Sequence, residues 1–212
     1  EWKFSINEMP TGFYGPTHRL LFDTISPVNA SDLLTDEIYS MLPEVYRVLA
    51  NDGDTTHLLK VHDTCRRAPS GEWLYPEDAV HSVIYLVRHP FDVAVSLAPH
   101  LNLSLPEAVE FMATGAKSEQ SAFDLELALP QDKSSWSENI TSWLDKSPHA
   151  VTLARYEDIF ANPLTEFVRI ASAAGFDRPH DQIARSLELA SFENMREEEK
   201  KSGFRERPKT ST

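Results

Sequence analysis

The sequence predicts an α/β fold in which a parallel β-sheet is flanked by helices. Three short apolar runs carry this prediction, at residues 57–62, 83–87 and 150–154, and segments with helical periodicity separate them. Parallel strands need long crossover connections, so an alternation of strands and helices favours a parallel sheet. With 212 residues, 41% of them hydrophobic, residues 1–212 are expected to form a single domain around one core.

The central element of this prediction is a strand that runs directly into a helix. The run Val83–Val87 has no polar alternation, which is typical of a strand buried on both faces. Pro90 suits the first helical position and Asp92 the positive end of the helix dipole. Free N–H groups there, with the Arg88 guanidinium and the Ser96 hydroxyl, form a candidate phosphate site. The same residues also fit a surface ion pair of Arg88 and an ordinary Ser96 on a helix face.

The run 57–62 is predicted to be a second strand of the sheet. Its period of two places Lys60 and His62 on one face, at the end of the strand where open parallel sheets bind ligands. The charge of Lys60 favours a neutral imidazole, so His62 is suited to accept a proton near neutral pH. The alternative is a structural His62 held by hydrogen bonds at the strand end, with Asp63 as a partner.

Helical periodicity and capping signals place the remaining elements. Pro43 is expected to kink or restart the helix that contains it. The expected helices cover 18–24, 35–50, the capping box at Ser104 to Gly115, the capping box at Ser135 to Leu144, Asn162 to Gly175, 183–189, and the charged segment after Ser191.

Composition excludes several classes of partner. The net charge of −13 argues against general binding to nucleic acids or anionic membranes. No apolar run approaches the ~20 residues of a membrane span, and the eight histidines show no metal-ligand spacing, so no metal is expected. A single cysteine, Cys65, allows no internal disulfide and indicates a reducing compartment, so we expect a cytoplasmic protein.

Two segments resemble motifs of one enzyme family. Arg88-His-Pro-Phe-Asp-Val-Ala-Val-Ser96 is similar to the 3′-phosphate-binding motif of the sulfotransferases that use 3′-phosphoadenosine 5′-phosphosulfate (PAPS). The resemblance implies that Arg88 and Ser96 hold the 3′-phosphate. Leu59-Lys-Val-His62 resembles the family's Lys-Thr-His segment, which implies that His62 is the catalytic base and that Lys60 contacts the transferring sulfonate.

Three further segments follow in the family's order. The segment Ser135–Trp143 resembles the Gly-Ser-Trp segment before a helix that lines the acceptor side, although its two tryptophans also fit an ordinary core. Tyr156 stands in a Tyr-Glu-Asp sequence, where the resemblance implies contact with the adenine, and a buried tyrosine with a satisfied hydroxyl is the alternative. Ser191–Met195 resembles Ser-Phe-x-x-Met, which implies that Phe192 stacks on the adenine.

Together these segments resemble a sulfotransferase domain of the bacterial cytosolic type. The resemblance implies a three-layer, P-loop NTPase-like fold and transfer of a sulfonate from PAPS to a hydroxyl or amine of a small-molecule acceptor, without a metal. No recognisable acceptor pattern is present in residues 63–80 and 100–133, which would shape the acceptor pocket. Two alternatives stay open: an inactive module that binds a nucleotide or a partner, and a P-loop kinase-like enzyme.

Two parts of the family pattern have no counterpart in the chain. Residues 1–56 contain no Lys-Ser-Gly loop of the kind that cradles the 5′-phosphosulfate, since the segment 12–16 lacks the lysine and a preceding strand. The glycine-rich loop that covers the nucleotide is absent too, although 203–208 resembles the approach to it. We therefore expect a domain that is incomplete at both ends, and one that can be inactive by itself.

Overall fold

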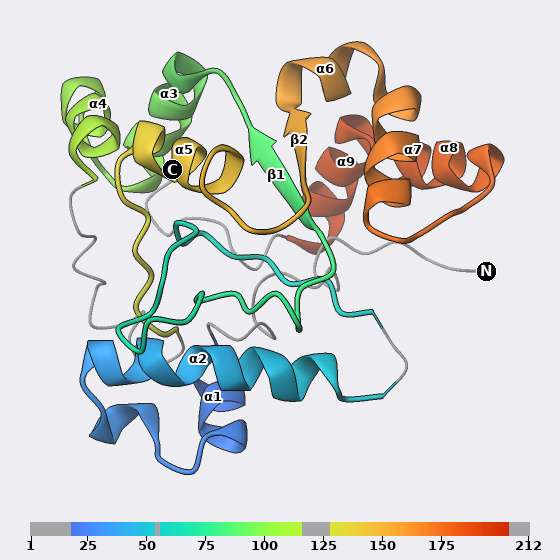
Figure 1. Ribbon diagram of the computed structural model, residues 1–212. Coiled ribbons are helices and arrows are strands. Elements are labelled where there is room, and N and C mark those ends of the chain that lie inside the picture. Colours follow the sequence, from blue (N-terminus) through green and yellow to red (C-terminus); the bar gives the residue numbers. More distant parts are fainter. Residues whose placement is uncertain (1–17, 54–55, 116–127, 204–212) are drawn as a thin grey trace.

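The computed structural model describes residues 18–53, 56–115 and 128–203. The segments 12–16 and 204–208, which were compared with family loops, lie outside the described residues. In chain order the elements are α1 (Arg19–Ile25), the 3-10 helix η2 (Ala30–Asp32), α2 (Thr35–Ala50), β1 (Val83–Val87), α3 (Pro90–His100), α4 (Leu105–Thr114), α5 (Trp136–Leu144), β2 (Val151–Arg155), α6 (Tyr156–Ala161), α7 (Pro163–Ala173), α8 (His180–Leu189) and α9 (Phe192–Ser202) (Figure 1).

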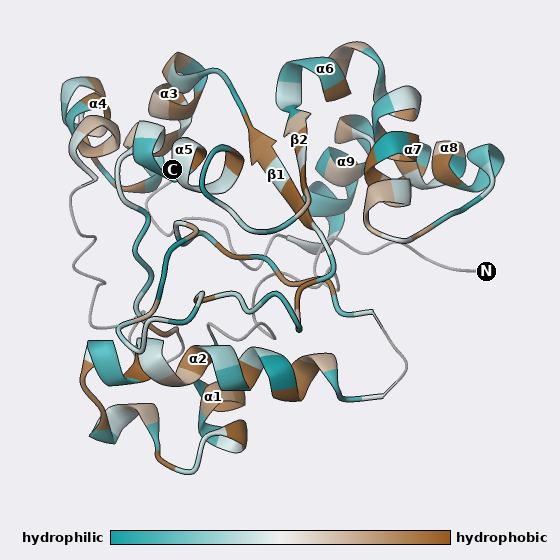
Figure 2. Cartoon of the chain, viewed as in Figure 1, coloured by the Kyte–Doolittle hydropathy of each residue, from teal (hydrophilic) through white to brown (hydrophobic). Residues whose placement is uncertain are grey.

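The two strands form a parallel pair, as the sequence predicted. Their register runs from Val83 opposite Val151 to Val87 opposite Arg155, so both strands end at the same edge. Helices α3, α4 and α5 lie on the β1 side of the strand pair and helices α6 to α9 on the β2 side (Figure 1). Figure 2 shows the apolar run of β1 as a continuous hydrophobic ribbon. The α/β class is therefore confirmed, with a sheet of two strands among the described residues.

The prediction of a strand at residues 57–62 is wrong, although the predicted alternation of inward and outward side chains is correct. Leu59 and Val61 pack against the core, whereas Lys60 and His62 are exposed. Directly after this segment, the Asp63 carbonyl and the Cys65 N–H form hydrogen bonds with side chains of α5. A period of two reports which side chains face inward, but a strand also needs a neighbouring backbone to pair with.

The main core lies between α2 and the irregular segment that follows it. Its largest fully buried side chains are Phe22, Leu42, Val45, Leu74 and Leu129. The interruption expected at Pro43 does not occur, because α2 continues through this residue from Thr35 to Ala50. Pro43 is itself buried in the core face of the helix, so packing offsets the loss of its backbone donor.

Capping residues set the boundaries of the helices around the site. Ser104 and Ser135 both form the predicted capping boxes, each with a glutamate three residues on. Gly115 ends α4 in a left-handed conformation with φ of 62°. A Cβ on this glycine would lie 2.2 Å from the carbonyl carbon of Ser134, so the end of α4 touches the backbone that starts α5. Ser191 caps α9 as predicted, whereas α8 begins at His180, three residues before the predicted start.

Candidate nucleotide and transfer site

Arg88 and Tyr156 meet where the two strands end. Each residue directly follows one member of the last register pair, Val87 and Arg155. The Cζ atom of Arg88 lies 4.4 Å from the centroid of the Tyr156 ring, which is a cation–π contact. Tyr156 is 46% exposed, so the alternative of a buried tyrosine does not hold. The structure thus brings together two of the predicted nucleotide-binding residues.

Arg88 retains hydrogen-bonding capacity at this edge. Its Nη2 atom lies 3.4 Å from Oδ2 of Asp92, the local ion pair that the alternative interpretation expects. Its Nε atom is buried and has no hydrogen-bond partner within the described residues. An exposed ion pair of this kind is worth about 0–1 kcal/mol, so an anionic ligand can compete with Asp92 for the guanidinium.

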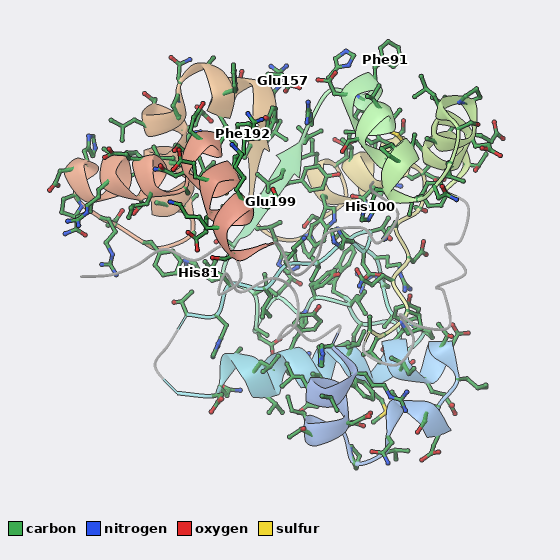
Figure 3. The ribbon with its side chains drawn as sticks, turned by 180° about the vertical axis from the view of Figure 1, so that it is seen from behind. His81, Phe91, His100, Glu157, Phe192 and Glu199 are labelled. Carbon is green, nitrogen blue, oxygen red and sulfur yellow. The ribbon has the colours of Figure 1, made fainter. Side chains whose placement is uncertain are left out.

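The start of α3 is less open to an anion than the sequence suggested. The His89 N–H donates to Oε1 of Glu157 at 2.8 Å, and the Phe91 N–H lies 3.4 Å from Nδ1 of His89. The bond from the His89 N–H lowers the pKa of Glu157, so this carboxylate remains charged. Glu157 and Phe91 both lie at the end of the molecule where the strands finish (Figure 3). Two of the N–H groups at the start of α3 are therefore already hydrogen-bonded within the protein.

Ser96 and Phe192 are exposed on separate helices. Ser96 lies in α3, and Phe192 is the first residue of α9 and is 70% exposed (Figure 3). Within the described part of the chain, no hydrogen bond, ion pair or ring contact joins either residue to Arg88 or Tyr156. Both side chains remain available for a ligand.

The backbone around His62 is held by α5 and by the residues that precede it. The Asn139 side chain donates to the His62 carbonyl at 3.2 Å, and the indole N–H of Trp143 donates to the Asp63 carbonyl at 3.0 Å. The Cys65 N–H donates to the Ser142 hydroxyl at 2.9 Å. Trp143 is buried, as the core alternative expected for it, and it also fixes the segment that carries His62.

The surroundings of His62 favour its neutral form. Protein packed around the ring, then the charges of Lys133 and Lys60, lower the pKa of His62 to about 4. His62 also keeps exposed surface, so burial lowers its pKa less than it would for a fully enclosed ring. The charges of both lysines lower the pKa as well.

Asp63 does not pair with His62. Its buried carboxylate instead accepts the Asp132 N–H at 2.6 Å. Burial raises the pKa of Asp63 to about 7. The predicted alternative of a structural His62–Asp63 hydrogen bond is therefore not what holds His62 in place.

Three residues of this region were not identified from the sequence: Asp63 as an anchor, Lys133 and Asn139. Lys133 lies two residues before the Ser135 capping box, in a stretch without periodicity, and contacts of this kind leave no periodic signal. The sequence around Asn139 contains no signal for its contacts with His62 and Lys133. No group of three or more potential metal ligands occurs among the described residues. No helix of the described chain is long and apolar enough to cross a membrane.

Comparison with known proteins assigns the chain to a family. The model of the Sulfotransferase domain matches residues 74–208, which is more than half of the chain. The match covers β1, the Arg88–Ser96 motif, Tyr156 and Phe192, and it begins after Lys60 and His62. The chain belongs to the sulfotransferase domain family.

Three solved structures that match the chain share 22% sequence identity with it. Mouse sulfotransferase SULT7A1 complexed with PAP matches with a TM-score of 0.43 over 57% of this chain and 43% of that one. Retinol dehydratase with androsterone and the inactive cofactor PAP matches with a TM-score of 0.48, over 84% of this chain and 50% of that one. Retinol dehydratase with retinol and PAP matches with the same score, over 91% and 57%. The chain thus spans about half the length of these proteins, and a search of curated proteins found no match.

Proposed function

We propose that the protein transfers a sulfonate group from PAPS to a hydroxyl or amine of a small-molecule acceptor, with His62 as the general base. The observation that carries this proposal is the contact between Arg88 and Tyr156 at the common end of β1 and β2. The family motifs assign these two residues to the 3′-phosphate and the adenine of one nucleotide. Such roles require side chains that lie close together on one edge of the sheet.

The nucleotide would be held by four residues. Arg88 and Ser96 would bind the 3′-phosphate, and the partly exposed side chain of Arg88, whose ion pair with Asp92 is also exposed, supports this role. Tyr156 and Phe192 would bind the adenine, since both present exposed aromatic surface. PAPS supplies the activated sulfonate, and we expect no metal in the reaction. The binding site would also need a loop for the 5′-phosphosulfate, and residues 1–56 contain no Lys-Ser-Gly sequence of that kind.

The transfer step would use the neutral imidazole of His62. The acceptor oxygen or nitrogen would attack sulfur as His62 takes its proton, and the bond between sulfur and the phosphate oxygen would break. Lys60 and Lys133, which both lower the pKa of His62, would place positive charge near the sulfonate oxygens. Charge stabilisation and positioning supply most of the catalysis in such transfers.

An inactive nucleotide-binding module is the second candidate function. The bond between Glu157 and the His89 N–H favours it, because it occupies part of the anion site at the start of α3. Under either function we propose a single domain, in keeping with the length of 212 residues. We also propose that it is cytoplasmic, and the support for this is that Cys65 is the one cysteine of the sequence.

The test is sulfonate transfer by the full-length protein, with PAPS and a panel of phenols, alcohols and amines. We expect turnover that falls at least 100-fold in His62→Gln, because general base catalysis contributes about 10²–10⁴-fold. His180→Gln, an exposed histidine at the start of α8, is the matched control. Calorimetric titration with adenosine 3′,5′-bisphosphate and with ATP accompanies it. Tight binding of the bisphosphate without turnover would favour the inactive module, and binding of ATP alone would favour a kinase-like enzyme.

A further inference from the structure

Asn139 is hydrogen-bonded to three segments that are far apart in the sequence. Its Oδ1 atom accepts the Tyr85 hydroxyl of β1 at 2.8 Å. Its Nδ2 atom donates to the His62 carbonyl at 3.2 Å and to the Lys133 carbonyl at 3.0 Å. One amide therefore connects β1, the strand that leads to Arg88, with the backbone of His62 and the backbone of Lys133.

The geometry leaves this amide few alternatives. A side-chain amide has two N–H donors, and here both are used on backbone carbonyls. Because both carbonyls lie within 3.2 Å of one nitrogen, the His62 and Lys133 carbonyl oxygens are at most about 6 Å apart. Asn139 thus keeps the backbone of Lys133 near that of His62, in agreement with the influence of the Lys133 charge on His62.

The helix that carries Asn139 is itself well fixed. The capping box of Ser135 starts α5, and the Ser142 hydroxyl, which accepts the Cys65 N–H, donates to the Asn139 carbonyl at 2.7 Å. The segment 57–62 has no strand pairing of its own, so the position of His62 relative to β1 depends on core packing of Leu59 and Val61 and on hydrogen bonds to neighbouring segments, of which those of Asn139 connect it to β1. An asparagine that merely satisfied its own helix would not bond to three separate segments.

We propose that Asn139 is a positioning residue, which holds His62 and Lys133 against β1 and thereby sets the place of the general base relative to the nucleotide bound at the end of that strand. This inference rests on the proposed function. It requires no contact between Asn139 and either substrate.

The test compares Asn139→Ala and Tyr85→Phe with Asn51→Ala in the full-length protein. Asn51 also donates its amide to a backbone carbonyl, that of Arg47 at 2.9 Å, but at the end of α2. We expect Asn139→Ala to lower kcat by about 10–100-fold, since small misplacements of reacting groups carry losses of this size. Binding of adenosine 3′,5′-bisphosphate should stay within about twofold, because Arg88 and Tyr156 are untouched. Tyr85→Phe, which removes one of the three bonds, should show a smaller loss in kcat.

A second measurement does not depend on activity. The titration of His62 is followed by NMR of the histidine ring, with His62→Gln identifying its signal. In Asn139→Ala we expect the midpoint to move up by about one pH unit, because Lys133 and the surrounding protein no longer stay beside the ring. Asn51→Ala should leave it unchanged.

The outcomes separate this inference from the proposed function. Unchanged kcat and unchanged titration in both Asn139→Ala and Tyr85→Phe would overturn the positioning role. If Asn139→Ala does not fold, Tyr85→Phe decides by the same two measurements. If the wild type transfers no sulfonate, the proposed function fails, while the titration still shows whether Asn139 holds His62 in place.

Discussion

At the scale of single residues, the charge around His62 decides whether it can act as a base. Lys60 was visible in the sequence because it stands two positions before His62, on the same face of an extended segment. Lys133 is 71 positions further on, so only folding brings its charge near the ring. The structure therefore adds a second cation to the one that sequence spacing predicts.

Replacement of Lys133 tests this second cation. A nearby positive charge disfavours the imidazolium, so Lys133→Met should raise the pKa of His62 from about 4 toward its ordinary value of 6.5. More of the base is then protonated at mildly acidic pH. The acid limb of the pH profile of kcat/KM should move to higher pH by a few tenths of a unit up to about one unit. Lys146→Met, an exposed lysine just after α5, serves as the control and should leave the profile in place.

Asp63 gives a prediction about stability. Its pKa rises from 3.8 to about 7 on folding, so between these values the folded protein holds a proton that the unfolded chain has lost. Stability contributed by this group therefore falls as the pH rises through that window. At 1.36 kcal/mol per pKa unit, the difference between the two pKa values corresponds to a loss of at most about 4 kcal/mol in the free energy of unfolding.

Asp63→Asn keeps an oxygen to accept the Asp132 N–H and removes the titration. We expect the free energy of unfolding of this variant, relative to the wild type, to increase from pH 4 to pH 7.5, as measured by urea denaturation. Asp145→Asn, at the exposed end of α5, is the control. A constant difference across the pH range would show that Asp63 does not titrate on folding.

At the scale of elements, capping signals predicted boundaries that tertiary contacts left in place. The boxes at Ser104 and Ser135 depend on bonds within four residues, so they form wherever those residues stand. The segment 57–62 is the counter-example. Its apolar alternation is equally clear, but pairing depends on a distant backbone that local sequence does not specify.

The junction between α4 and α5 gives the prediction at this scale. Gly115→Ala should destabilise the protein by about 2–4 kcal/mol, since left-handed strain of about 1–2 kcal/mol adds to the overlap of the new Cβ with the backbone of Ser134. Gly175→Ala is the matched control, because Gly175 has a φ of 77° but open space around its Cβ position. Gly175→Ala should be destabilised by the left-handed strain alone, by about 1–2 kcal/mol. Equal losses in thermal or urea unfolding would mean that the close approach at Ser134 is unimportant.

At the scale of the whole molecule, an acidic protein is proposed to bind an anionic nucleotide. With a net charge of −13, the overall field repels such a ligand, so binding must depend on a local cation. The half-exposed Arg88 at the end of β1 is the cation that the family motif assigns to this role.

Ligand-induced stabilisation tests this dependence. Adenosine 3′,5′-bisphosphate at 100 times its Kd should stabilise the full-length protein by about 2.7 kcal/mol. Arg88→Met should abolish most of this gain at the same concentration, because the 3′-phosphate loses its main partner. Arg185→Met, which removes an exposed arginine of α8, should retain it. Equal stabilisation of both variants would place the nucleotide away from Arg88.

The sequence by itself determined most of what depends on neighbouring residues: all the longer helices, the caps at Ser104, Ser135 and Ser191, the strands 83–87 and 151–155 within one residue, and the motifs that identify the family. These features follow from local hydrogen bonds and from the periodicity of apolar side chains. Only the tertiary structure decided which distant groups meet, such as Arg88 with Tyr156, Lys133 with His62, and Asn139 with both His62 and Tyr85. Such contacts depend on how packed elements approach one another in space, and no spacing along a single chain encodes that directly.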